Sequence, residues 1–168
     1  RLTIDPRNTF PTTKGLFKLL PSNSTITREP ILQGVHVYNI DIEPSGDLWI
    51  GTFNQGIYLV QSESLEIIHH WPVATITKVY AEHPDFALVG TIEGLMHINK
   101  SDLSLTNLHN SERPQPQRSP RVVTWISKAN DGHFFIGTQG SGVHKMTYED
   151  SKFIFIPMNP QSHLATLS

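Results

Sequence analysis

Hydrophobic and polar residues recur in the same register at three places along the chain of 168 residues. Each copy ends in a Gly-Thr pair, and apolar residues stand fourteen, eleven, two and one positions before the glycine. The glycines are Gly51, Gly90 and Gly137. The apolar residues before them are Val37, Ile40, Trp49 and Ile50, then Ile76, Val79, Leu88 and Val89, then Val123, Ile126, Phe135 and Ile136. A pattern that keeps one register over this length indicates a repeated supersecondary unit.

Each copy predicts a β-hairpin followed by two further strands. Glycine, proline, asparagine and aspartate lie between the apolar clusters, as tight hairpin turns require. After the Gly-Thr pair a second glycine starts a third strand, and Ile57-Tyr58-Leu59-Val60 is apolar on both faces, which indicates a sheet packed between sheets. The predicted fourth strands are residues 65–68, 103–106 and 153–156.

Four strands per unit is typical of a propeller blade, so the predicted fold class is all-β, a β-propeller fragment of four-stranded antiparallel blades. The glycine-to-glycine distances, 39 residues from Gly51 to Gly90 and 47 from Gly90 to Gly137, bracket the length of one blade. We expect three full blades plus partial blades at both ends, all in one propeller domain. The predicted boundaries are a partial blade at 1–29 (third and fourth strands), blades at 30–71, 72–109 and 110–158, and the start of a next blade at 159–168.

The two ends carry pieces of the same pattern. Residues 15–19 match the third strand and residues 24–27 a fourth, whereas the first two strands of that unit are not recognisable. Residues 164–167 suit the inner strand of a following blade. Because a propeller is stable as a closed ring, we interpret the chain as a segment of a ring of about seven or eight blades. The alternative is a strained four-blade ring in which residues 164–167 pair beside residues 15–19.

A family resemblance rests on Ser45-Gly46-Asp47-Leu48-Trp49-Ile50-Gly51-Thr52 followed by Gly56-Ile57-Tyr58. This string resembles the repeat of two-component regulator propellers, with its Leu-Trp-Ile-Gly-Thr and Gly-Leu-Tyr strands. The resemblance covers residues 36–156 in three copies and 12–28 in part; the second copy has Leu88 and the third Phe135 in place of the tryptophan.

The resemblance implies a ligand-sensing propeller segment of a bacterial membrane signalling protein of the two-component type. Its location would be periplasmic, its parent protein membrane-anchored, and its ligand a carbohydrate or another small polar molecule. The signal would pass to a histidine kinase or a diguanylate cyclase, and neither output module is in this sequence.

The amino-acid composition limits which partners, cofactors and reactions we expect. The net charge is −2 with no basic field, so we expect no nucleic-acid partner. There is no cysteine, and the adjacent His69 and His70 would point to opposite faces of a strand, so we expect no metal and no cofactor. Asp47, Asp85 and Asp131 are interpreted as turn residues, and no pair of acid and base groups is apparent, so we do not expect an enzyme.

The candidate ligand-binding residues lie in the loops between second and third strands and in the connections between blades, which emerge on one rim of a propeller. Amide and guanidinium groups beside an aromatic ring suit a polyhydroxylated or acidic ligand. The candidates are Phe53, Asn54, Gln55, Glu93, Gln139, Ser141, Arg118 and Arg121.

Two other functions stay open from sequence. The first is a scaffold for protein–protein interaction or self-association, because open blade edges are templates for strand pairing. The second, less favoured, is a catalytic propeller such as a lyase or glycosidase. A polar funnel would favour the sensor, and an exposed apolar rim would favour the scaffold.

Overall fold

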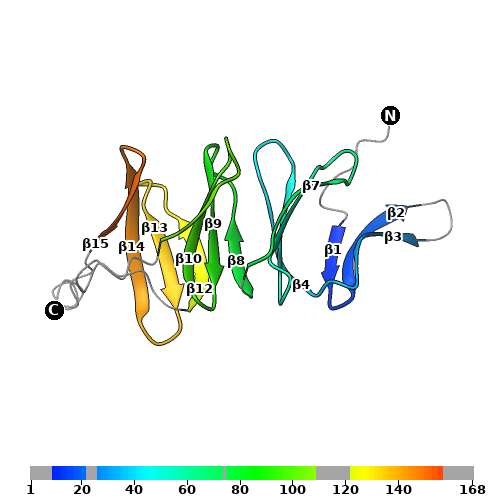
Figure 1. Cartoon of the computed structure of the whole chain (residues 1–168), viewed down its shortest axis with the longest axis horizontal. Helices are drawn as coiled ribbons and strands as arrows, with labels where there is room; N and C mark the ends of the chain where they lie inside the picture. The colour runs from blue at the N-terminus through cyan, green and yellow to red at the C-terminus, as the bar shows by residue number, and fades with distance from the viewer. Residues whose placement is uncertain (1–8, 22–25, 74, 109–121, 157–168) are drawn as a thin grey trace.

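The computed structural model of the chain describes residues 9–21, 26–73, 75–108 and 122–156. Within these residues there are fifteen strands and no helix. The strands form four antiparallel sheets, which follow one another in chain order along the long axis of the molecule (Figure 1). The all-β propeller fold predicted from the repeat is therefore confirmed, with one sheet per repeat.

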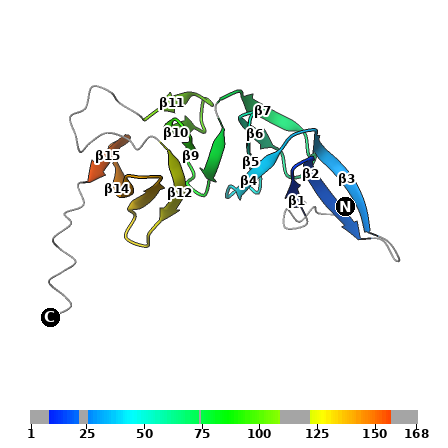
Figure 2. The ribbon, with the colours of Figure 1, turned by 90° about the horizontal axis from the view of Figure 1, so that it is seen from below.

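We name the sheets blades 1 to 4 in chain order. Blade 1 has three described strands and each of the others has four, with neighbouring strands consecutive in sequence. Figure 2 shows the inner strands β4 and β12 on one side of the row of blades and the outer strands β7 and β11 on the other. The strands are β1 (Thr9–Thr12), β2 (Gly15–Pro21) and β3 (Ile26–Gln33); β4 (Val37–Ile42), β5 (Leu48–Thr52), β6 (Ile57–Val60) and β7 (Ile67–Trp71); β8 (Ile76–Tyr80), β9 (Phe86–Thr91), β10 (Gly94–Asn99) and β11 (Leu105–Asn107); β12 (Val123–Lys128), β13 (Phe134–Thr138), β14 (Gly142–Glu149) and β15 (Lys152–Ile156).

The fourth strands of blades 2 and 3 begin two residues later than predicted. Leu65 and Leu103 were expected to start them but have positive φ angles of 61° and 59°, a left-handed conformation that a strand cannot contain. Both residues belong to the turn that precedes the strand. In blade 4 the predicted strand at residues 153–156 lies within β15.

Blade 1 contains more than the sequence indicated. A second strand, β1, pairs with β2, although it was not recognisable because Pro11 lies in its middle. Proline is tolerated there because β1 lies at the edge of its described sheet, where a missing N–H breaks no ladder bond. Strand β3 continues to Gln33, so the predicted boundary after residue 29 falls inside a strand. The predicted start of a next blade at 159–168 lies outside the described residues.

The blades pack face to face, and alternate residues of each strand serve opposite neighbours. Trp49, two positions before the glycine, packs in a buried cluster with blade 3, whereas Ile50 packs in a cluster with blade 1. Leu88 and Val89 divide in the same way between blades 4 and 2. Each of the three hydrophobic cores therefore lies between two blades and belongs to neither alone.

The glycines of the first two Gly-Thr pairs, Gly51 and Gly90, are required by this packing. A Cβ atom built on Gly51 would lie 2.6 Å from Cγ2 of Ile76, and one on Gly90 would lie 2.6 Å from Cγ1 of Val123. Ile76 and Val123 begin the inner strand of the following blade. The repeated glycine is thus a socket for the first inner-strand residue of the next blade.

The threonine of the pair closes the loop that follows. Oγ1 of Thr52, Thr91 and Thr138 donates a hydrogen bond to the carbonyl of the glycine at or directly before the start of the third strand, at 2.8, 3.0 and 2.7 Å respectively. Thr52 and Thr91 also accept a backbone N–H from Gln55 and Glu93. The recurrence of a glycine three or four residues after the threonine is therefore structural.

We predict that Gly90→Ala destabilises the fold by about 1–3 kcal/mol, because Val123 is stiff at Cβ and the site would be overpacked. Adding Val123→Ala removes the colliding Cγ1, so the double variant should lose less stability than the sum of the two single variants. Chemical denaturation of all four proteins measures this coupling. Strictly additive losses would show that the socket does not exist.

Candidate ligand-binding site

The ends of the blades form two rims. The first, here called the connection rim, contains the loops after β5, β9 and β13 together with the connections between blades. The second, here called the turn rim, contains the turns after β4, β6, β8, β10, β12 and β14, and it is uppermost in Figure 1. Those sequence-based candidates that lie within the described residues belong to the connection rim.

The structure places the described candidates in these loops, but their contacts are local. Phe53 and Asn54 are exposed, and the Phe53 ring stacks on His36 with centroids 5.4 Å apart. The side-chain oxygen of Gln55 accepts a hydrogen bond from the Tyr58 hydroxyl at 3.1 Å. The remaining described candidates, all exposed, are Glu93, Gln139 and Ser141. Arg118 and Arg121 lie outside the described residues, so their place in a site stays a prediction.

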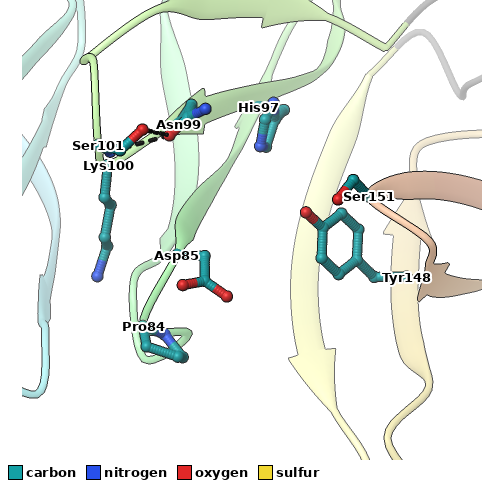
Figure 3. Close-up of a pocket in the computed structure, with 8 residues that line it drawn as sticks. All are labelled: Pro84, Asp85, His97, Asn99, Lys100, Ser101, Tyr148 and Ser151. Carbon is teal, nitrogen blue, oxygen red and sulfur yellow. Dashed lines mark hydrogen bonds between the residues drawn. The ribbon is translucent and has the colours of Figure 1, made fainter.

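A cleft of about 510 Å³ opens on the opposite rim, where blade 3 meets blade 4 (Figure 3). This volume lies within the range of roughly 300–1,000 Å³ found for small-molecule sites. The lining residues come from both blades and are mostly polar: Pro84, Asp85, His97, Asn99, Lys100, Ser101, Tyr148 and Ser151.

The blade architecture positions these groups. Asp85 lies in the turn between β8 and β9, and His97 is on the face of β10 that points toward blade 4. Tyr148 is on β14, on the opposite side of the cleft from Asp85 (Figure 3). Asn99 ends β10, and its side-chain oxygen accepts hydrogen bonds from the backbone and hydroxyl of Ser101 at 2.9 and 2.8 Å. That bonding directs the amide oxygen to the turn.

Buried aromatic rings support one wall of the cleft. The Tyr148 ring packs against Phe86 and Phe153, with centroids 4.6 and 4.7 Å away. His97 meets the same two rings at 5.6 and 4.9 Å in edge-on geometry. Because Phe86 and Phe153 are buried in the core between the blades, they fix the orientation of the phenol and the imidazole.

Burial sets the protonation state of the histidine. It lowers the pKa of His97 below the ordinary value of 6.5, and the negative charge of Asp102 only partly opposes this effect. At pH 7 the imidazole is therefore neutral and offers one hydrogen-bond donor and one acceptor. The pKa of His83, which stacks on Phe86, is lowered mainly by burial as well.

Lys100 lines the cleft, but its charge is already engaged. Its Nζ lies 2.7 Å from the Glu43 carboxylate of blade 2 and donates to the Ala81 carbonyl at 2.8 Å. Burial favours a raised pKa for Glu43, yet hydrogen bonds from Lys100, Ser45 and Trp49 and the lysine charge outweigh it, so the pKa is lowered. In Figure 3 the lysine lies on the side of the view opposite Tyr148. Lys100 is the one lysine or arginine among the described residues that line the cleft, so the Asp85 carboxylate has no unengaged lysine or arginine beside it in this lining.

Sequence reasoning assigned these residues other roles. The sequence pattern predicted Asp85 to be a turn residue, and it did not place His97 among the candidate ligand-binding residues. The position of His97 in the repeat distinguishes it from its counterpart in blade 2. His97 pairs with Leu88, and Leu59 holds the equivalent position opposite Trp49. Blade 4 has Lys145 at the equivalent position, opposite Phe135, so blade 2 alone of these three blades has an apolar residue there.

No protein-family model and no curated protein matches the sequence. Among solved structures, the extracellular domain of the putative hybrid two component system BT3049 from B. thetaiotaomicron is similar, with a TM-score of 0.65 and 19% identity over 90% of this chain. Two structures of the extracellular domain of BT4673 from the same organism, described as a putative one component or hybrid two component system, give 0.64 and 20% over 92%. This chain has their fold. It spans about a fifth of the length of those proteins, 20% in each case.

We predict that the His97 ring titrates below pH 6.5 and that Asp102→Asn lowers its pKa further, because the substitution removes the charge that favours protonation. The unfolded chain then binds a proton at higher pH than the folded one. The stability from a neutral His97 is full above the unfolded pKa and is lost as the pH falls through the folded pKa. NMR titration, with His97→Gln to assign the signal, measures the shift. A pKa at or above 6.5 would contradict the desolvation expected of this half-buried ring.

Proposed function

We propose that this chain is a ligand-sensing propeller segment of an extracytoplasmic signalling domain. The observation that carries the proposal is the fold, which matches part of the extracellular domains of signalling systems. Those proteins are described as signalling systems and not as enzymes, which supports sensing over catalysis, and their extracellular domains support a periplasmic location. Among the described residues there is no helix long and apolar enough to cross a membrane.

The cleft on the turn rim is the binding site that the geometry favours. It combines a carboxylate, a neutral imidazole, an amide and a phenol around one volume, and it has an ordered aromatic wall. These groups are hydrogen-bonding partners for hydroxyl groups, and the phenol ring offers an apolar surface. Because the Lys100 charge is engaged by Glu43, an acidic ligand would meet the Asp85 carboxylate without a compensating cation. The ligand class we propose is a neutral polyhydroxylated molecule, such as an uncharged sugar.

The connection rim is the competing location. Its exposed amide and aromatic side chains, among them Asn54, Phe53 and Gln139, would suit the same ligand class. Self-association through open blades also stays a prediction, and light scattering over a range of concentrations measures it directly. The two rims differ in a testable way because they share no residue.

We predict that Asp85→Ala and Asn99→Ala each weaken binding of a neutral sugar by about tenfold, the effect of losing roughly one well-placed hydrogen bond. The ligand is first found by a thermal-shift screen of neutral sugars and sugar acids, and affinities are then measured by calorimetry. Gln139→Ala is the matched control on the connection rim and should leave the affinity unchanged.

If Gln139→Ala lost affinity for the sugar and Asp85→Ala did not, the binding site would lie on the connection rim. The proposed sensing function would still stand. Preference for sugar acids over neutral sugars would overturn the proposed ligand class. A protein that responds to no member of the screen would count against sensing of carbohydrates altogether.

A further inference from the structure

The face of blade 4 that points away from blade 3 carries apolar side chains that are largely exposed. Trp125, Val143 and Ile154 are 59%, 53% and 45% exposed. Leu95 holds the position of Val143 in blade 3, since each pairs with the glycine of its Gly-Thr motif, and Leu95 is fully buried. Blade 4 thus has the surface of an interface without its partner.

The two preceding interfaces define what such a face accepts. In each, the first apolar residue of the next inner strand sits on the repeated glycine. A Cβ built on Gly51 would lie 3.2 Å from Cβ of Ile76, and one on Gly90 would lie 3.1 Å from Cβ of Val123. A Cβ built on Gly137 meets only its own blade, with Cβ of Trp125 at 3.1 Å as the nearest described atom. Its socket is free of any described residue from a following blade.

The inner strands that fill these sockets share a local pattern. Two apolar residues stand three positions apart because a bulge intervenes, as the register shifts between Ile76 and Lys78 and between Val123 and Trp125 show. The bulged position of β12, Thr124, is exposed. The pairs are Val37 with Ile40, Ile76 with Val79, and Val123 with Ile126.

The same spacing recurs in residues 164–167, which read Leu-Ala-Thr-Leu and lie outside the described residues. Leu164 follows Gly137 by 27 positions. Ile76 follows Gly51 by 25 positions, and Val123 follows Gly90 by 33. Both the internal pattern and the distance from the glycine therefore match an inner strand of the next blade.

We propose that residues 159–168 dock on the open face of blade 4 as the inner strand of a following blade, with Leu164 in the Gly137 socket. Leu167 then takes the place of Val79, whose N–H is bound by Asn39 of the preceding blade. Trp125 occupies the Asn39 position in blade 4, two places into the strand. The docked strand therefore covers Trp125, of which Lys78 now covers one face at 5.1 Å.

A cysteine pair tests this contact. Gly137→Cys with Leu164→Cys should form an intramolecular disulfide on oxidation, because the equivalent Cβ atoms lie within a few tenths of an ångström of the ~3.5–4.5 Å that a disulfide needs. The chain has no other cysteine, so the product is unambiguous on a non-reducing gel. Gly51→Cys with Ile76→Cys is the matched control at an interface that the structure describes.

The outcomes separate the occupants of the face. A monomeric cross-link supports docking of the chain's own segment. A covalent dimer would show that a second copy fills the socket, and no cross-link in the presence of a formed control would leave the face open; either result overturns the proposal.

Tryptophan fluorescence gives a second measurement without cysteines. Of the three tryptophans, Trp49 and Trp71 are 0% and 5% exposed, so Trp125 dominates quenching by acrylamide. Leu164→Asp with Leu167→Asp should increase quenching and shift the emission to the red. Ala165→Asp places the same charge at the position of the exposed Thr124 and should change neither. Equal quenching in all three proteins would also overturn the proposal.

Discussion

The packing of one blade face on the next is the interaction on which the rest of the structure depends. Each sheet is apolar on both faces, so no blade can bury its side chains by itself. Close approach is possible because Gly51 and Gly90 have no side chain where Ile76 and Val123 arrive. The glycine, which looked in sequence like a strand end, is in fact the contact that sets the distance between blades. Each blade is therefore stabilised by its contacts with the neighbouring blades, as in other repeat architectures.

The hydrogen bonds between neighbouring blades differ from one interface to the next. Between blades 2 and 3, Asn39 and Asp41 accept the backbone N–H groups of Val79 and Ala81 at 2.8 and 2.6 Å. Val79 is in β8 and Ala81 directly follows it, and β8 is the edge strand of its described sheet. The two side chains therefore supply the hydrogen-bond acceptors that a neighbouring strand would otherwise provide. Between blades 3 and 4, the Thr77 hydroxyl donates to the Val123 carbonyl instead. The apolar pattern repeats while the hydrogen bonds do not.

The repeat made the blades, their order and the Gly-Thr turns predictable, because each depends on residues in one short window. The start of β7 was missed because Leu65 adopts a left-handed conformation that leucine rarely shows. Strand β1 was missed because Pro11 argues against a strand unless the strand lies at an edge. The cleft escaped prediction for a different reason. Its walls, His97 and Tyr148, belong to separate repeats and meet only when blades 3 and 4 pack together.

That origin also explains why the cleft differs from the other interfaces. A face that receives the next blade is apolar in blade 2, where Leu59 pairs with Trp49, but blade 3 has His97 at the corresponding position. A polar ring in such a place loses free energy unless it stays neutral and keeps a route to hydrogen-bonding partners. Burial lowers its pKa, which meets the first condition, and the opening toward Asp85 and Tyr148 meets the second. Residues that keep the repeat build the scaffold, and a residue that departs from it at an interface creates a site where a ligand can supply the missing contacts.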